Sequence, residues 1–132
     1  MMEKISLRTS KRTVLIDITS KIQEVIVKSN VKNGICIVYC PHTTAGITIN
    51  EAYDPSVQTD IAFAVDKLVP DYREFTHSEG NSDSHTKTSL IGASENIIIN
   101  DGKMMLGKWQ GIYFTEFDGP RAREIWIQII GH

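Results

Sequence analysis

The sequence predicts an α+β domain whose sheet is mostly antiparallel and is accompanied by two main helices. Apolar residues alternate with a period of two in several segments, which indicates strands, and recur at helical spacing in two others. The segments follow the order two strands, helix, strands, helix and hairpins. This order favours an antiparallel sheet with helices packed on it, because hairpins join antiparallel neighbours.

The first third of the chain contains two predicted strands, a helix and a third strand. Residues 3–8 and 13–18 alternate apolar and polar side chains, as strands do. Helical spacing then relates Ile18, Ile22, Val25 and Ile26. Either Thr19 or Ser20 is the expected N-cap of this helix, and Asn33-Gly34 its expected end. The apolar run at 35–40 predicts a short buried strand.

The middle of the chain predicts one more strand and the clearest helix. Residues 47–51 continue a strand pattern after the polar break at 41–46. Asp54 and Pro55 are typical of a helix start, and Pro70 marks its end. The apolar stripe of this helix consists of Val57, Ile61, Ala64, Val65 and Leu68.

Residues 71–89 form a long polar segment that predicts a functional loop. The segment has two histidines, four carboxylates and almost no aliphatic side chains. Polar loops of this length are unusual inside a small domain and often carry function. A short helix is expected to begin at Ser82 or Asp83 and to end at Gly92.

The last forty residues predict β-structure. Asp101-Gly102 is typical of a type I′ hairpin turn, and Asp118-Gly119-Pro120 is a second predicted turn, which leads into the final strand. That strand places Ile125, Ile127 and Ile129 on one face and apolar Trp126 and Ile130 on the other. We therefore expect both faces to be buried, either by helices of this chain or by another subunit.

Composition sets wide bounds on the class of protein. A length of 132 residues predicts a single domain, residues 1–132. A formal net charge of -2 argues against nucleic acid as a partner. No apolar run approaches the roughly 18 residues of a membrane span, so no membrane partner is expected. The N-terminal residues lack an export signal, so a cytoplasmic location is expected, with Cys36 and Cys40 as small, reduced, buried side chains.

Three of the four histidines follow or lie in polar breaks of the chain: His42, His77 and His85. Neutral imidazole is a common zinc ligand, and three protein ligands with a water form the usual catalytic site. Their spacing matches no regular metal motif, so ordinary loop histidines are the alternative. Glu51, Glu79 and Asp83 are the carboxylates available to orient them.

Two other pairs of residues are candidates for binding an anion. Thr43 and Thr44 either donate hydroxyl groups to an anion or cap a turn. Arg121 and Arg123 lie two residues apart, and either clamp a phosphate or carboxylate or form salt bridges with nearby glutamates, Glu116 or Glu124.

Trp109-Gln110 lies between Gly107 and Gly111. The two glycines allow a close approach of the backbone, which suits a ligand pocket or only a strand bulge.

Several motifs resemble those of the YjbQ family, which has been labelled a secondary thiamine-phosphate synthase. The resemblance covers about residues 5–131 in the expected order. Its motifs are CPHTTAGITINE at 40–51, His77, NSDSH at 81–85, LIG at 90–92, LGKWQGI at 106–112 and DGPRAR at 118–123. Ser84 departs from the family pattern, which more often has alanine there.

The resemblance implies an α+β fold that assembles as a homotrimer, with a polar cleft near subunit contacts. It also implies a divalent metal ion held by His42, His77 and His85. Zinc is the first expectation, with nickel, manganese and magnesium as alternatives. The family label implies condensation of a pyrimidine pyrophosphate with a thiazole phosphate.

The functional hypothesis is a metal-dependent enzyme that acts on a small phosphorylated or otherwise anionic substrate. In this hypothesis Glu51 or Asp83 serves as general base, and Arg121 and Arg123 neutralise substrate charge. Thr43, Thr44, Trp109 and Gln110 are the remaining predicted substrate contacts. The alternatives are a non-catalytic trimer that binds a metal or small ligand, and a structural trimer whose polar loop contacts a partner protein.

Overall fold

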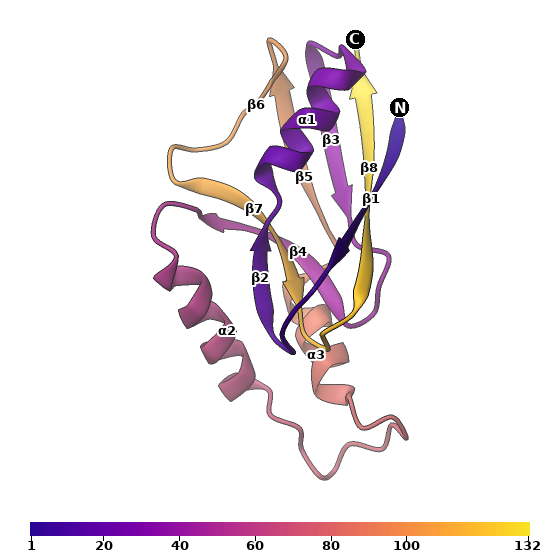
Figure 1. Cartoon of the computed structure of the whole chain (residues 1–132), viewed down its shortest axis with the longest axis vertical. Helices are drawn as coiled ribbons and strands as arrows, with labels where there is room; N and C mark the ends of the chain where they lie inside the picture. Colours follow the sequence, from indigo (N-terminus) through magenta and orange to yellow (C-terminus); the bar gives the residue numbers. More distant parts are fainter.

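A computed structural model of residues 1–132 contains eight strands and three helices, arranged as two antiparallel sheets (Figure 1). The strand order is β1-β8-β3-β5-β6 in the larger sheet and β2-β7-β4 in the smaller one. Every neighbouring pair of strands is antiparallel. The predicted α+β class is confirmed, but the helices number three, since the short polar helix is a full element.

The five-stranded sheet has one buried and one open face. Its strands are β1 (Met2–Arg8), β8 (Ala122–Gly131), β3 (Asn33–Tyr39), β5 (Ser94–Asn100) and β6 (Lys103–Met104). Ile125, Ile127 and Ile129 are buried as predicted, whereas Ile130 on the other face is 57% exposed. The helices of this chain therefore do not cover the second face, contrary to one of the two expectations.

The three-stranded sheet consists of β2 (Val14–Asp17), β7 (Gln110–Glu116) and β4 (Ala45–Glu51). The hairpin at Asp101-Gly102 is confirmed, since both residues have the positive φ angles, 52° and 76°, that a type I′ turn requires. The second predicted turn, at 118–120, instead carries the chain from β7 in one sheet to β8 in the other. A local turn signal does not distinguish these two outcomes.

Helix α1 (Thr19–Ser29) buries Ile22, Val25 and Ile26 in a core shared with both sheets. Asp17, rather than Thr19 or Ser20, satisfies the helix start, because its Oδ1 accepts bonds from the Thr19 amide and hydroxyl at 2.9 and 2.6 Å. The helix ends at Asn30, whose left-handed conformation (φ 59°) closes it. Asn33 and Gly34, the predicted end, already belong to β3.

Helix α2 (Ser56–Leu68) begins and ends close to the predicted positions but has no buried residue. Asp54 Oδ1 accepts a bond from the Ser56 amide at 2.9 Å. The apolar stripe lies at the surface or half-buried, and Leu68 is 69% exposed. Polar contacts hold the helix instead, because Asp66 accepts bonds from Thr13 Oγ1 at 2.9 Å and Lys87 Nζ at 2.8 Å.

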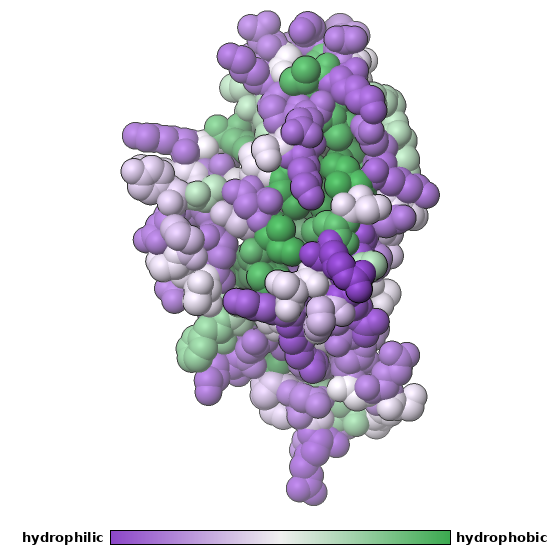
Figure 2. All heavy atoms as spheres, in the orientation of Figure 1, coloured by the Kyte–Doolittle hydropathy of each residue, from purple (hydrophilic) through white to green (hydrophobic).

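Helix α3 (Ser82–Ile91) lies in the lower part of the molecule in Figure 1, behind the lower ends of the strands. It confirms the predicted short helix, and it leaves residues 69–81 as the irregular connection from α2. Figure 2 shows a hydrophobic band down the middle of the visible face, while the lower end is largely hydrophilic. The molecule thus has an aliphatic upper part and a polar lower part. None of its helices has the length and apolar character needed to cross a membrane.

The contact between β3 and β8 generates a stability prediction. A Cβ atom at Gly34 would lie 2.0 Å from the backbone oxygen of Ile130. We expect Gly34→Ala to lower the free energy of unfolding by about 2 kcal/mol or more, because the strands must separate to admit it. Gly107→Ala is the control, since its Cβ would meet only the Gln110 side chain at 3.2 Å. Urea denaturation measures both, and equal stabilities would contradict the assigned register.

Candidate functional site

The three predicted histidines border one polar cavity at the lower end of the molecule. The cavity has a volume of about 400 Å³, and none of its 11 lining residues is hydrophobic. His85 comes from α3, His77 from the 69–81 connection and His42 from the segment that follows β3. The His77 and His85 rings are nearly perpendicular, with centroids 5.3 Å apart. The fold therefore brings together side chains that are 43 positions apart in sequence, from residue 42 to residue 85.

His42 is held by the backbone of β8. Its Nε2 accepts a hydrogen bond from the Glu124 amide at 2.9 Å. Burial lowers the pKa of His42, and the nearby positive charge of Arg123 lowers it further. A neutral ring that accepts at Nε2 carries its proton on Nδ1.

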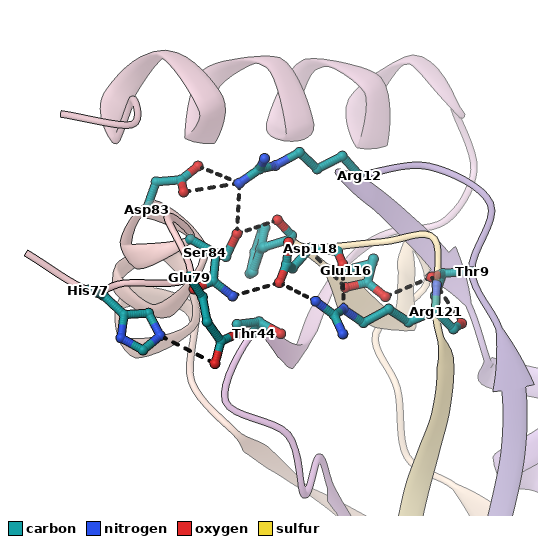
Figure 3. A network of polar contacts seen from close by, with 12 residues as sticks. Thr9, Arg12, Thr44, His77, Glu79, Asp83, Ser84, Glu116, Asp118 and Arg121 are labelled. Carbon is teal, nitrogen blue, oxygen red and sulfur yellow. Dashed lines mark hydrogen bonds and ion pairs between the residues drawn. The ribbon is translucent and has the colours of Figure 1, made fainter. Parts of the chain in front are cut away.

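The three histidines share the cavity without forming a ready metal site. No three His, Cys, Asp or Glu side chains are arranged to hold a metal ion. His77 Nε2 lies 3.8 Å from Glu79 Oε1. Figure 3 shows these two side chains facing each other, whereas His42 bonds to the Glu124 amide instead. Coordination by all three imidazoles requires His42 to give up its bond with the Glu124 amide.

A buried ion pair supports one wall of the cavity, to which it contributes Arg123. Arg123 donates to both carboxylate oxygens of Glu116, with an Nε–Oε1 distance of 2.8 Å. Its Nη2 also donates to Thr44 Oγ1 at 2.9 Å, and Thr9 Oγ1 donates to Glu116 Oε1 at 2.7 Å. Of the two interpretations of Arg123, the structure contains the salt bridge to Glu116. Arg123 is therefore occupied with Glu116 and Thr44, and Thr44 with Arg123, so neither side chain is free to clamp a ligand.

Arg121 and Thr43 remain accessible at the cavity. The Arg121 side chain is 50% exposed, and its Nη2 donates to Asp118 Oδ2 at 2.8 Å (Figure 3). The same Asp118 oxygen accepts a bond from Asn81 Nδ2 at 2.8 Å. Thr43 is exposed. These two residues retain the predicted capacity to bind an anion.

Asp83 does not line the cavity, contrary to its predicted role as a general base. Its two carboxylate oxygens lie 3.0 and 3.1 Å from Arg12 Nη2, and Lys87 Nζ lies 3.2 Å from Oδ2. Figure 3 shows Arg12 reaching across to this carboxylate. With its side chain 6% exposed and paired to two cations, Asp83 holds α3 in place.

Glu51, Trp109 and Gln110 form a separate group at the far end of β4. Glu51 pairs with Gln110 across the sheet, and Trp109 packs edge-on against Tyr53 with centroids 4.9 Å apart. A strand of this length spans about 20 Å, which separates the group from the histidines in a single chain. Glu51 and Trp109 are thus not parts of the histidine cavity of their own chain.

Asn81 and Asp118 also line the cavity, although neither is among the site residues predicted from the sequence. Both lie in motifs shared with the family, NSDSH and DGPRAR, and the Asp-Gly-Pro pattern at Asp118 indicates only a turn. Their positions in the sequence, close to His85 and Arg121, are the signal that could have indicated them, because both neighbours are predicted site residues.

The fold and the site together define a small α+β protein with a histidine-lined polar cavity. The family model of the YjbQ-like UPF0047 proteins matches residues 3–132 of the sequence, and the chain therefore belongs to this family. UPF0047 protein MJ1081 of Methanocaldococcus jannaschii is 56% identical over 99% of this chain and 95% of its own length. UPF0047 protein YugU of Bacillus subtilis is 44% identical over 99% of this chain and 100% of its own length.

Solved structures show the same fold. A YjbQ/UPF0047 protein from Clostridium acetobutylicum superposes with a TM-score of 0.95 at 52% identity, covering 97% of this chain and 99% of that one. A YbjQ-like protein of unknown function from Sulfolobus solfataricus also superposes with a TM-score of 0.95. It is 31% identical, and the match covers 100% of this chain and 97% of that one.

The Glu116 pair generates a pH prediction. Burial by itself would raise the pKa of Glu116, but hydrogen bonds from Arg123, the Asp118 amide and Thr9 outweigh it and lower the pKa. The folded state therefore binds fewer protons than the unfolded state in mild acid. The stabilisation is complete above the ordinary glutamate pKa of about 4.3 and is lost as the pH falls through the lowered folded pKa.

We expect Glu116→Gln to lose about 3 kcal/mol of stability at pH 7, because Arg123 keeps a buried charge without its counter-charge. Its stability should then depend less on pH below about 4.3. Urea denaturation between pH 3 and 7 measures both effects. If the stability of the variant fell with decreasing pH as steeply as that of the wild type, Glu116 would not be the group whose pKa is lowered.

Proposed function

We propose that this protein is a metal-dependent enzyme that acts on a small phosphorylated or otherwise anionic substrate. The histidine cavity carries the proposal, because three imidazoles and the half-exposed Arg121 guanidinium gather in a hollow without hydrophobic lining. Sites of this composition bind polar, charged ligands rather than apolar ones.

His42, His77 and His85 would hold the metal ion. Three neutral imidazoles suit zinc in kind and number, and leave a coordination position open, while nickel, manganese and magnesium are alternatives. The lowered pKa of His42 keeps this ring neutral, as a ligand must be. A bound ion would polarise a substrate oxygen or acidify a water molecule.

The residues of the chain itself would bind and orient the substrate. Arg121, steadied by Asp118, would pair with the anionic group, and Thr43 would donate its hydroxyl. Glu79 lies on the cavity wall and can hold a proton at Oε1. Glu79 therefore replaces Glu51 and Asp83 as the proposed general base.

Thiamine-phosphate synthesis is the finer form of this proposal. The condensation joins a pyrimidine pyrophosphate to a thiazole phosphate and releases pyrophosphate, so both substrates and the leaving group are anionic. The cationic Arg121 at the cavity supports this reaction class, whereas the reaction itself rests on the family label.

A non-catalytic trimer that binds a metal or small ligand is the second candidate. One observation favours it, namely the bond between His42 Nε2 and the Glu124 amide, which leaves the three imidazoles unassembled.

Metal content and activity together test the enzyme. We expect purified protein incubated with zinc and then gel-filtered to retain about one ion per chain. His85→Ala should lose most of this metal and its turnover of the two thiamine precursors, because two imidazoles seldom suffice to hold zinc. Elemental analysis and product chromatography provide the measurements.

His132→Ala is the matched control, because His132 is exposed at the chain end and outside the cavity. Metal binding without turnover of any phosphorylated substrate would favour the non-catalytic candidate. Equal metal content in wild-type protein and in His85→Ala would remove the metal from the proposal.

We also propose that the chain forms a homotrimer through the open face of the five-stranded sheet. Ile35, Ile98 and Ile130 are 47%, 64% and 57% exposed there, and Tyr39 stacks on Trp126 with centroids 5.9 Å apart. An apolar area of this kind on a small protein usually marks an interface.

Light scattering tests this assembly. We expect a trimer mass for the wild type and a monomer or dimer mass for Ile98→Asp, which places a charge among apolar side chains. Val27→Asp, which places the same charge at an exposed apolar residue of α1, away from the open face, should remain trimeric. A monomeric wild type would refute the assembly.

A further inference from the structure

A second cavity shares a wall with the histidine cavity. Its volume is also about 400 Å³, and His42, Thr43 and His85 line both cavities. The rest of its lining consists of Thr88, Ser89, Gly92 and Ala93. The histidine cavity has Arg121, Arg123, Glu79 and Asp118 on its walls. The second cavity has no Asp, Glu, Lys or Arg, and no aromatic ring other than the shared imidazoles.

The end of α3 builds the wall of hydroxyl groups. Ser89 Oγ donates to the backbone oxygen of His85 at 3.0 Å, which leaves the lone pairs of the hydroxyl available as acceptors. Gly92 follows at φ 104° with no atom within 4 Å of the place where a Cβ would lie. The wall is therefore polar, uncharged and roomy.

Thr88 has an unused hydrogen-bonding group at this wall. The residue is only 9% exposed, and its Oγ1 has no hydrogen-bond partner. A buried hydroxyl without a partner destabilises the free protein. Threonine in a helix readily adopts either of two χ1 rotamers, so Thr88 can turn its hydroxyl toward a ligand that offers a partner.

We propose that the second cavity holds the hydroxylated part of a substrate whose phosphate lies beside Arg121 in the histidine cavity. This inference rests on the proposed function and narrows its substrate class to phosphate esters of sugars or polyols, in place of the planar pyrimidine and thiazole phosphates of the thiamine reaction. Hydroxyl groups both donate and accept, as Thr43, Thr88 and Ser89 do. Apart from the shared imidazoles, a planar aromatic group finds no aromatic ring here, and no hydrophobic side chain larger than Ala93, on which to pack.

Calorimetric titration with three probes tests the proposal: inorganic phosphate, ribose 5-phosphate and phenyl phosphate. The zinc-treated wild-type protein should bind ribose 5-phosphate about tenfold more tightly than phosphate, and phenyl phosphate no more tightly than phosphate. Thr88→Val keeps the shape of the side chain and removes the hydroxyl. It should weaken ribose 5-phosphate binding about fivefold, leave phosphate binding unchanged, and keep or raise the melting temperature.

Thr86→Val is the control, because Thr86 is exposed on the same helix and its hydroxyl bonds to the Ser82 backbone oxygen at 2.9 Å. It should leave the affinities of all three probes unchanged. Suppose that the wild type binds phosphate and ribose 5-phosphate equally tightly, and that Arg121→Met abolishes phosphate binding. This result would overturn the inference about the second cavity and leave the proposed function standing. Absence of binding by every probe would overturn both.

Discussion

The ion pair between Glu116 and Arg123 joins the two sheets at the base of the site. Glu116 ends β7 in the smaller sheet, and Arg123 lies on β8 in the larger one. Thr44, just before β4, and Thr9, just after β1, complete its hydrogen bonds. A buried pair compensates for its desolvation only when its geometry is good and its remaining bonds are satisfied. The position of the cavity wall therefore depends on both sheets being formed.

The lower end of the molecule depends on charge in the same way. Asp83 ties α3 to Arg12, and Lys87 links α3 to Asp66 on α2. The upper part depends on aliphatic packing between α1 and the sheets. This division matches the sequence, where residues 71–89 carry histidines and carboxylates in place of aliphatic side chains. Polar contacts place the site, and hydrophobic contacts stabilise the scaffold above it.

Local signals predicted most of the elements but not how the strands assemble. The hairpin at Asp101-Gly102 and the helix ending at Gly92 follow from residues within a few positions of one another. The separation of β7 from β8 into different sheets depends on their partners, β4 and β3, which are remote in sequence.

For the candidate site too, local sequence signals predicted some features, while others depend on partners remote in sequence. Histidines 42, 77 and 85 could be selected by residue type and by their place in polar breaks. The burial of Asp83 could not be predicted in this way, because its partner Arg12 lies 71 residues away in the sequence. Arg123 offered two partners close in sequence, Glu116 and Glu124, and only the strand geometry decides for Glu116. Residue type indicates what a side chain can bind, whereas the fold decides whether it is already bound.

Because α2 has no buried residue and is held by polar contacts, we expect the two sides of the cavity to respond differently to ionic strength. His42 follows a strand whose ladder of backbone hydrogen bonds is insensitive to salt. His77 lies on the connection between α2 and α3, and those helices are joined by the ion pair between Lys87 and Asp66, whose carboxylate side chain is 47% exposed. Salt screens partly exposed charges far more than buried bonds. We therefore expect rising ionic strength to loosen the connection that carries His77 more than the segment that carries His42.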